Sequence, residues 1–245
     1  MSSIVAPVIR EVTPGVVIFS VPFKLGLIPF GGRSTAIQLS TGDVWLMASH
    51  QPEETTRSAL ASLGRVRYIV SAAAGHNFYL AAYKSLYPDA LVIGVDGQQE
   101  KLASQGVKLD GVYFSDASET KYGFEDEIAS IPFYGHSRSA LAFYHTATKS
   151  LVQADLLFNL PARESFSAIK QTGSIPLLTS QFKPGAFLHQ QTVSGFIVDK
   201  GLFKRASDQV LSLDMERIIP CHGDVLERSK GDDPHGKWEL AYRFL

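Results

Sequence analysis

Three histidines and one aspartate occupy positions in this 245-residue sequence where metal chemistry is possible. His76, His136 and His222 lie beside short apolar runs typical of β-strands, and Asp155 ends another such run. Imidazole nitrogens and carboxylate oxygens are ligands that zinc and similar ions prefer. Loops at strand ends are also where a rigid scaffold presents functional groups. If the fold brings these four side chains together, they predict a site for one divalent metal ion.

The pattern of apolar and turn-forming residues predicts the elements that position these groups. Short β-branched runs indicate strands, and two pairs of them flank turn-forming tetrads, as in hairpins. Three-residue apolar spacing and a proline-acid start indicate helices. The expected strands are 16–21, 35–39, 44–47, 66–70, 90–95, 141–144, 150–152 and 217–220, and the expected helices are 52–63, 78–86, 98–105 and several within 165–213. Two β-rich halves with helices favour a layered α/β sandwich, in a single domain over residues 1–245.

The composition excludes several classes of protein. The 23 Lys+Arg residues balance 24 Asp+Glu residues, and the net charge of −1 argues against sequence-independent binding of nucleic acid. The single cysteine, Cys221, excludes an intramolecular disulfide. The first residues lack the features of a signal peptide, and no apolar run reaches the length of a membrane span. We expect a cytoplasmic protein that acts on a small molecule, with its oligomeric state left open.

The order of the motifs resembles that of the metallo-β-lactamase superfamily. Gly135-His136-Ser137 is similar to the family's Gly-His-Ser/Thr step, and a hairpin over 141–152 follows it. Ala154-Asp155-Leu156-Leu157-Phe158 is similar to the family's Gly-Asp-x-x-Phe, with Ala154 in place of the glycine. His222-Gly223 resembles its last metal histidine. The resemblance covers about Val16 to Asp224. It implies a four-layer αββα sandwich and a metal-dependent hydrolase of a small-molecule ester, thioester, amide or lactone.

The first metal motif departs from that family. Where the family has His-x-His-x-Asp-His, this chain has Ala72-Ala73-Ala74-Gly75-His76-Asn77, and methyl groups cannot coordinate a metal. His76 takes either the aspartate position or, after a one-residue shift, the last histidine position. The resemblance therefore implies one metal ion, zinc first, held by His76, His136, Asp155 and His222, with His76 and Asp155 as catalytic residues. Such an ion lowers the pKa of bound water from about 15.7 to about 7. A site without metal remains the alternative.

Other residues carry weaker signals. Asp224 could orient His222 by accepting a hydrogen bond from the ring nitrogen that does not bind the metal, and His145 could lie close to the site. Cys221 could act as a thiolate ligand or nucleophile, although a buried apolar role is the simpler expectation. His50, His189 and His235 stand in no motif and are expected to be structural, and the aromatic residues Phe23, Phe30, Phe78 and Tyr79 are candidates for a pocket wall.

Two other functions stay open. Gly135–Ser139 partly imitates the nucleophile elbow of serine α/β-hydrolases, with Ser137 as the nucleophile. Ser139 replaces the closing glycine of that elbow, however, and a strand-like run follows where a helix is required. The altered first motif also fits a non-hydrolytic or metal-free protein, either a condensing or isomerising enzyme or a binding protein.

Overall fold

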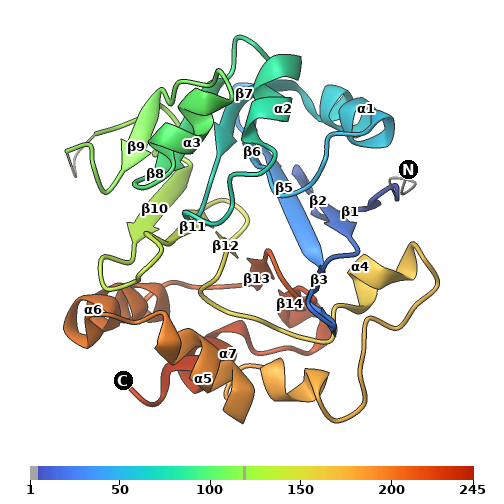
Figure 1. Ribbon diagram of the computed structural model, residues 1–245, viewed down its shortest axis with the longest axis vertical. Helices are drawn as coiled ribbons and strands as arrows, with labels where there is room; N and C mark the ends of the chain where they lie inside the picture. Colours follow the sequence, from blue (N-terminus) through green and yellow to red (C-terminus); the bar gives the residue numbers. More distant parts are fainter. Residues whose placement is uncertain (1–4, 118–119) are drawn as a thin grey trace.

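The computed structural model describes residues 5–117 and 120–245, and within them the strands form two main sheets (Figure 1). The larger sheet has the order β1 (Val8–Thr13), β2 (Val16–Val21), β5 (Gly32–Gln38), β6 (Asp43–Met47), β7 (Arg65–Val70), β8 (Leu91–Val95) and β9 (Gly111–Tyr113). The smaller sheet has the order β10 (Ile128–Pro132), β11 (Leu141–His145), β12 (Ser150–Gln153), β13 (Arg217–Pro220) and β14 (Leu226–Glu227). A short ribbon pairs β3 (Lys24–Leu25) with β4 (Ile28–Pro29).

Helices cover the outer face of each sheet, as Figure 1 shows. The larger sheet carries α1 (Glu54–Leu63), α2 (Leu80–Leu86) and α3 (Gln99–Ser104), and the smaller sheet carries α5 (Phe187–Gly195), α6 (Lys200–Leu211) and α7 (Pro234–Tyr242). The short α4 (Arg163–Ser167) contacts β1 and β2. Single-turn 3-10 helices occupy Thr179–Phe182 and Arg228–Lys230. This is the four-layer αββα sandwich that the family resemblance implied.

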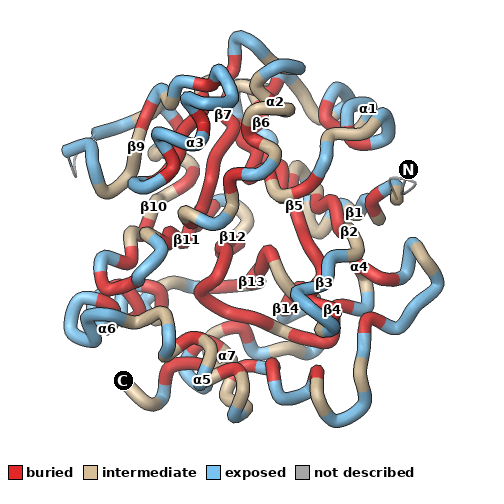
Figure 2. Tube along the Cα trace, in the orientation of Figure 1, coloured by how far each residue is buried: buried red, intermediate tan, exposed pale blue. Residues whose placement is uncertain are grey.

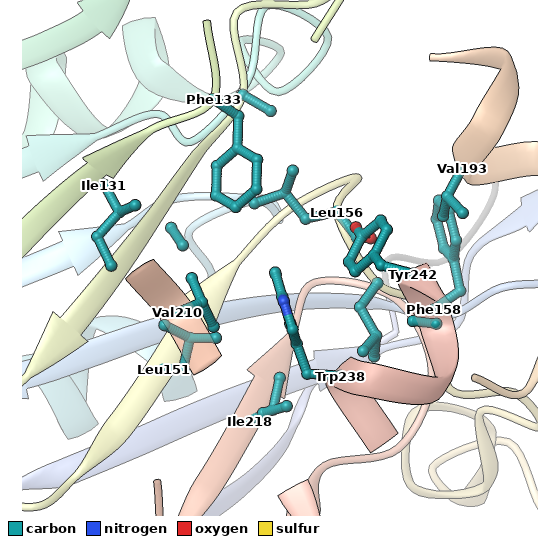
Figure 3. Packing of buried hydrophobic residues seen from close by; sticks show 14 of the residues in the cluster. Ile131, Phe133, Leu151, Leu156, Phe158, Val193, Val210, Ile218, Trp238 and Tyr242 are labelled. Carbon is teal, nitrogen blue, oxygen red and sulfur yellow. The ribbon is translucent and has the colours of Figure 1, made fainter. Parts of the chain in front are cut away.

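Three hydrophobic clusters separate the four layers, because alternate side chains of each buried strand point to opposite faces. In β7, Val70 packs between the sheets and Ile69 packs under α1–α3. In β12, Val152 packs between the sheets and Leu151 packs toward α5–α7. Figure 3 shows the cluster between the smaller sheet and α5–α7, with Trp238 of α7 among its labelled residues, and Figure 2 shows that the central strands are buried. Each sheet is therefore buried on both faces along its central strands.

The region after Asp155 departs most from the sequence-based expectation. Helices were expected through much of 165–213, but residues 168–178 form no helix. Gly173 has a φ of 60° and Leu177 a φ of 63°, and Pro176 has no N–H to donate to a helix. The sequence patterns also failed to predict α7, the β3–β4 ribbon and the edge strands β1, β9, β10 and β14. Among the described residues, no helix has the length and hydropathy needed to cross a membrane.

Candidate metal centre

The predicted ligands lie in loops that leave the carboxyl ends of strands. His76 follows β7, Asp155 follows β12, and His222 follows β13. Strands β12 and β13 are parallel, and their last register pair is Gln153 with Pro220. Asp155 and His222 therefore each stand two residues beyond the same point of the sheet, which places them close together.

Four side chains form the centre, which we call the metal cluster: His76, Asp155, Cys221 and His222. His76 Nε2 lies 3.3 Å from Asp155 Oδ1, and His222 Nε2 lies 3.9 Å from the same oxygen. Cys221 Sγ lies 3.6 Å from His76 Nδ1. Candidate ligand atoms of His76, Cys221 and His222 all lie within 4.8 Å of one another. The structure thus brings together three of the four predicted ligands and adds Cys221, which the sequence reading expected to be an inert core residue.

The charges of the metal cluster stabilise one another. Burial alone would lower the pKa of His76, but the charges of Cys221 and Asp155 raise it well above its usual value. Burial would raise the pKa of Asp155, but His76, His222 and Arg138 hold it far below its usual range. Burial would also raise the pKa of the Cys221 thiol, which His222 and His76 instead lower to about 6. The cluster without metal therefore favours anionic Cys221 and Asp155 on either side of a charged imidazole.

The His222 ring is oriented by the backbone at the start of β5. His222 Nδ1 donates to the Gly31 carbonyl at 2.6 Å, so in the neutral ring the lone pair is on Nε2, which faces Asp155. The Gly223 N–H donates to the Phe30 carbonyl at 2.8 Å. Metal-binding histidines in proteins usually donate their other ring N–H to such a carbonyl, as His222 Nδ1 does to Gly31, and this bond fixes the tautomer and the orientation of the ring.

A buried arginine holds both ends of the His222 loop. Arg33 Nη1 donates to the carbonyls of Pro220 and Gly223, at 2.7 and 2.6 Å. Its Nε donates to Ser20 Oγ at 3.1 Å, and its Nη2 lies 3.8 Å from Glu164 Oε1. The sequence reading missed Arg33. The available signal was a lone charge just before the expected strand 35–39, since an arginine that becomes buried requires several hydrogen-bond partners.

His136 lies beside the Asp155 turn but outside the group of closely spaced donors. Its Nδ1 accepts a hydrogen bond from the Arg138 backbone N–H at 3.1 Å, so in the neutral ring the proton sits on Nε2. That Nε2 is buried and has no hydrogen-bond partner among the described residues. Burial lowers the pKa of His136 to about 4, although the Asp155 charge opposes this. In this tautomer the nitrogen without a hydrogen-bond partner carries the proton and is a donor, which does not suit a metal ligand.

The structure corrects the two expected supporting contacts. Asp224 does not bond to His222, because its carboxylate accepts from the Glu164 N–H at 3.0 Å, at the start of α4. His145 lies at the far end of β11 from the metal cluster, with Nδ1 2.7 Å from Thr148 Oγ1 in the hairpin turn. The alternation of side chains along a strand indicates on which face of the sheet His145 lies, but it does not indicate how far along the strand His145 is from the metal cluster.

The remaining histidines have structural partners, as expected. His50 lies between Ser34 Oγ and Thr56 Oγ1, His189 Nε2 accepts from the Phe158 N–H, and His235 Nε2 bonds to the Leu211 carbonyl.

Two of the aromatic residues proposed as a pocket wall contact His222. The rings of Phe23 and His222 are stacked with centroids 5.7 Å apart, and Phe30 meets the same imidazole edge-on at 6.0 Å. Phe158, which the sequence reading did not single out as a wall residue, stacks on His222 at 6.0 Å. The ring of Phe78 instead lies under Lys101, with Nζ 4.1 Å from its centroid. Aromatic contacts thus surround the His222 imidazole.

The serine-hydrolase alternative is wrong, because Ser137 does not lie in the strand–turn–helix that a nucleophile elbow requires. Ser137 is followed by strand β11, whereas a nucleophile elbow leads from a strand into a helix. The Ser137 N–H donates to the Phe196 carbonyl at 2.8 Å, which places it in a loop between β10 and β11.

The donors of the metal cluster fit one divalent ion. His76 and His222 can combine with Cys221 through His76 Nδ1, or with Asp155 through His76 Nε2. Either set offers three protein ligands of the kinds that catalytic zinc uses. Ala72 is fully buried between the sheets and Ala74 packs against the same core, so neither offers a donor for a second ion.

Comparison with known proteins identifies the fold. No protein-family model matches the sequence, and no curated protein matches it. Among solved structures, a metallo-β-lactamase from Hirschia baltica is similar with a TM-score of 0.60 and 11% identity, covering 96% of this chain and 98% of that chain. The metallo-β-lactamase FIM-1 from Pseudomonas aeruginosa, in its mono-zinc form, is similar with a TM-score of 0.58 and 13% identity, covering 98% and 94%.

A third similar structure is a mutant flavo di-iron protein from Thermotoga maritima, with a TM-score of 0.61 and 14% identity. That comparison covers 96% of this chain and 61% of the other. Likeness at such low identity reports the fold and not the activity. The resemblance first seen in the motifs is confirmed at that level: this chain has the metallo-β-lactamase fold.

Proposed function

We propose that this protein is a hydrolase that uses one divalent metal ion to cleave an ester, thioester, amide or lactone of a small molecule. Zinc is the first candidate for this ion. The observation that supports this most strongly is the meeting of His76, Asp155 and His222 from three separate loops, 3.3 and 3.9 Å apart. The His222 tautomer is already the one that a metal ligand needs. The mono-zinc form of FIM-1 indicates that a protein of this fold can bind a single zinc ion.

The residues of the metal cluster have distinct roles in this proposal. A metal ion held there would supply Lewis acidity, which polarises a carbonyl group and acidifies water. His222 presents Nε2, with its ring fixed by Gly31. Asp155 stays ionised at neutral pH and orients His76 through Nε2. His76 lies between a carboxylate and a thiol, so whichever ring nitrogen would face the ion, the other nitrogen holds a proton toward the remaining group.

The proposal is tested with zinc-loaded protein and a panel of 4-nitrophenyl esters, thioesters and lactones. We expect His222→Ala and Asp155→Asn each to lose bound zinc and at least about 100-fold in kcat/KM, because His222→Ala removes a ligand and Asp155→Asn removes either a ligand or the carboxylate that orients His76. His145→Ala is the matched control, because His145 is a buried histidine at the other end of β11. Full activity in either ligand variant, or no turnover of any substrate by the zinc-loaded wild type, would contradict the proposal.

A metal-free hydrolase is a second candidate, because Cys221, His76 and Asp155 form a chain of contacts at 3.6 and 3.3 Å. That is the order of a nucleophile, its base and the acid that orients the base. The thiolate would attack the acyl carbon, the alcohol would leave with a proton from His76, and water would then release the acyl group. Activity that survives a chelator but is lost in Cys221→Ser would identify this reaction, whereas activity lost to the chelator and restored by zinc supports the metal.

A further inference from the structure

We propose that Arg138 recognises a carboxylate group on the substrate, so that the hydrolase prefers anionic substrates. This inference rests on the proposed function and names its substrate class. Arg138 Nη1 lies 3.6 Å from Asp155 Oδ2, at the edge of the metal cluster. The Arg138 side chain is 49% exposed, whereas that of Asp155 is 8% exposed. The guanidinium group therefore stands between the buried cluster and the solvent from which a substrate arrives.

The position of the Arg138 guanidinium is fixed by its surroundings. Its central carbon lies 4.6 Å from the centroid of the Phe196 ring, a cation–π contact. Its backbone joins two loops of the site, because its N–H donates to His136 Nδ1 and its carbonyl accepts from the Ala74 N–H at 2.9 Å. An arginine held in this way loses less side-chain entropy when it binds a ligand than a mobile one does.

The hydrogen-bonding capacity of Arg138 is unused in the part of the chain that the structure describes. The 3.6 Å separation from Asp155 is too long for a hydrogen bond, and the side chain donates to no other described residue. Gly75 borders the same space: a Cβ placed there would lie 3.6 Å from Arg138 Nη1 and 3.9 Å from Asp155 Oδ2. The missing side chain at Gly75 keeps open an approach toward both groups.

The charges at the site also favour an anion. Arg138 is the cation at the edge of the metal cluster, and its half-exposed guanidinium forms no hydrogen bond with any described residue. Lys101, a second cation near the 71–77 loop, is already engaged, because its Nζ donates to Asn77 Oδ1 at 2.6 Å. The planar guanidinium binds a carboxylate through two parallel hydrogen bonds, which makes that group the best match.

The experiment compares two esters of similar size, neutral 4-nitrophenyl butyrate and anionic mono-4-nitrophenyl succinate. The measured quantity is the ratio of kcat/KM for the anionic ester to that for the neutral ester, in zinc-loaded protein. We expect Arg138→Met to lower this ratio about 10- to 100-fold, the effect of losing hydrogen bonds between charged groups, and Arg138→Lys to lower it less. Arg57→Met is the matched control, because Arg57 is 45% exposed and pairs with a carboxylate, Glu54, on the distant helix α1.

A binding measurement separates this inference from the proposed function. Fluorine NMR of 4-fluorobenzoate reports weak binding of a carboxylate whether or not any ester is hydrolysed. We expect Arg138→Met to weaken that binding at least about tenfold and Arg57→Met to leave it unchanged. If the wild type hydrolyses neither ester, the proposed function fails while the NMR result still decides the role of Arg138. An unchanged kcat/KM ratio, or unchanged binding of 4-fluorobenzoate in Arg138→Met, would overturn the inference.

Discussion

Replacing Arg33 with methionine tests how the site is held together. The substitution keeps an unbranched side chain but removes the guanidinium that donates to the Pro220 and Gly223 carbonyls at 2.7 and 2.6 Å. A hydrogen bond from a charged donor contributes about 1.5–3 kcal/mol, and two buried carbonyls lose theirs at once. Glu164 also loses a cation 3.8 Å away. We therefore expect the free energy of unfolding, measured in urea, to fall by about 3–5 kcal/mol.

The same substitution should also weaken metal binding. Arg33 fixes the backbone on both sides of Cys221-His222, so without it these two ligands lose their support. Loss of groups that orient metal ligands typically costs about 10- to 100-fold in affinity. We expect the zinc dissociation constant of folded Arg33→Met, measured by competition with a chromophoric chelator, to rise by that factor. If this variant does not fold, Arg33→Lys offers the same test with the charge kept.

The control is Arg10→Gln, which disrupts the same ionic network at its other side. Arg10 Nε lies 2.9 Å from Glu164 Oε2 and Arg10 Nη1 lies 3.0 Å from Glu227 Oε2, but Arg10 makes no described contact with the His222 loop. We expect this variant to lose stability without a change in zinc affinity. An Arg33→Met protein that is destabilised but binds zinc like the wild type would refute the reasoning, because Arg33 would then act on the fold alone.

Three further predictions concern single residues. Gly223→Ala should lower the free energy of unfolding by about 2 kcal/mol or more and weaken zinc binding, because Gly223 has a φ of 89° and a Cβ there would lie 2.3 Å from the Asn159 carbonyl oxygen. Burial lowers the pKa of His50 to about 3, so its contribution to stability is complete above about pH 6.5 and is lost as the pH falls toward 3. Between pH 7 and pH 5 that loss is about 2 kcal/mol in urea unfolding, and His50→Gln should remove this part of the pH dependence. Ser137→Ala should keep wild-type turnover, because Ser137 does not lie in a nucleophile elbow. A large loss of turnover would instead support Ser137 as the nucleophile.

The sequence predicted those features of the site that depend on strand ends. Asp155 and His222 could be placed together because each follows a strand, and β12 and β13 are parallel neighbours in the sheet. The same reasoning misplaced His145, because residues on one face of a strand still differ in their distance along it. The contact of His222 with Gly31 joins a side chain to a backbone carbonyl 191 residues away, and no residue type marks such an acceptor.

The role of Cys221 was the least accessible from sequence. A buried cysteine beside a histidine in the chain is common core material, and adjacent strand residues point to opposite faces. Its contact with His76 Nδ1 exists because Cys221 lies just beyond β13, where strand alternation no longer applies, and because the His76 ring turns its other nitrogen to Asp155. Such a ring orientation depends on packing between three distant loops.

The most direct test of the central claim is the metal content of the protein. Wild-type protein and a His76→Ala/His222→Ala double variant would be incubated with zinc, dialysed against metal-free buffer and measured by elemental mass spectrometry. The two histidines belong to both donor sets of the metal cluster. We predict about one zinc ion per wild-type chain, and none retained by the folded double variant. A wild type that retains no metal, or a double variant that retains as much as the wild type, would contradict the account.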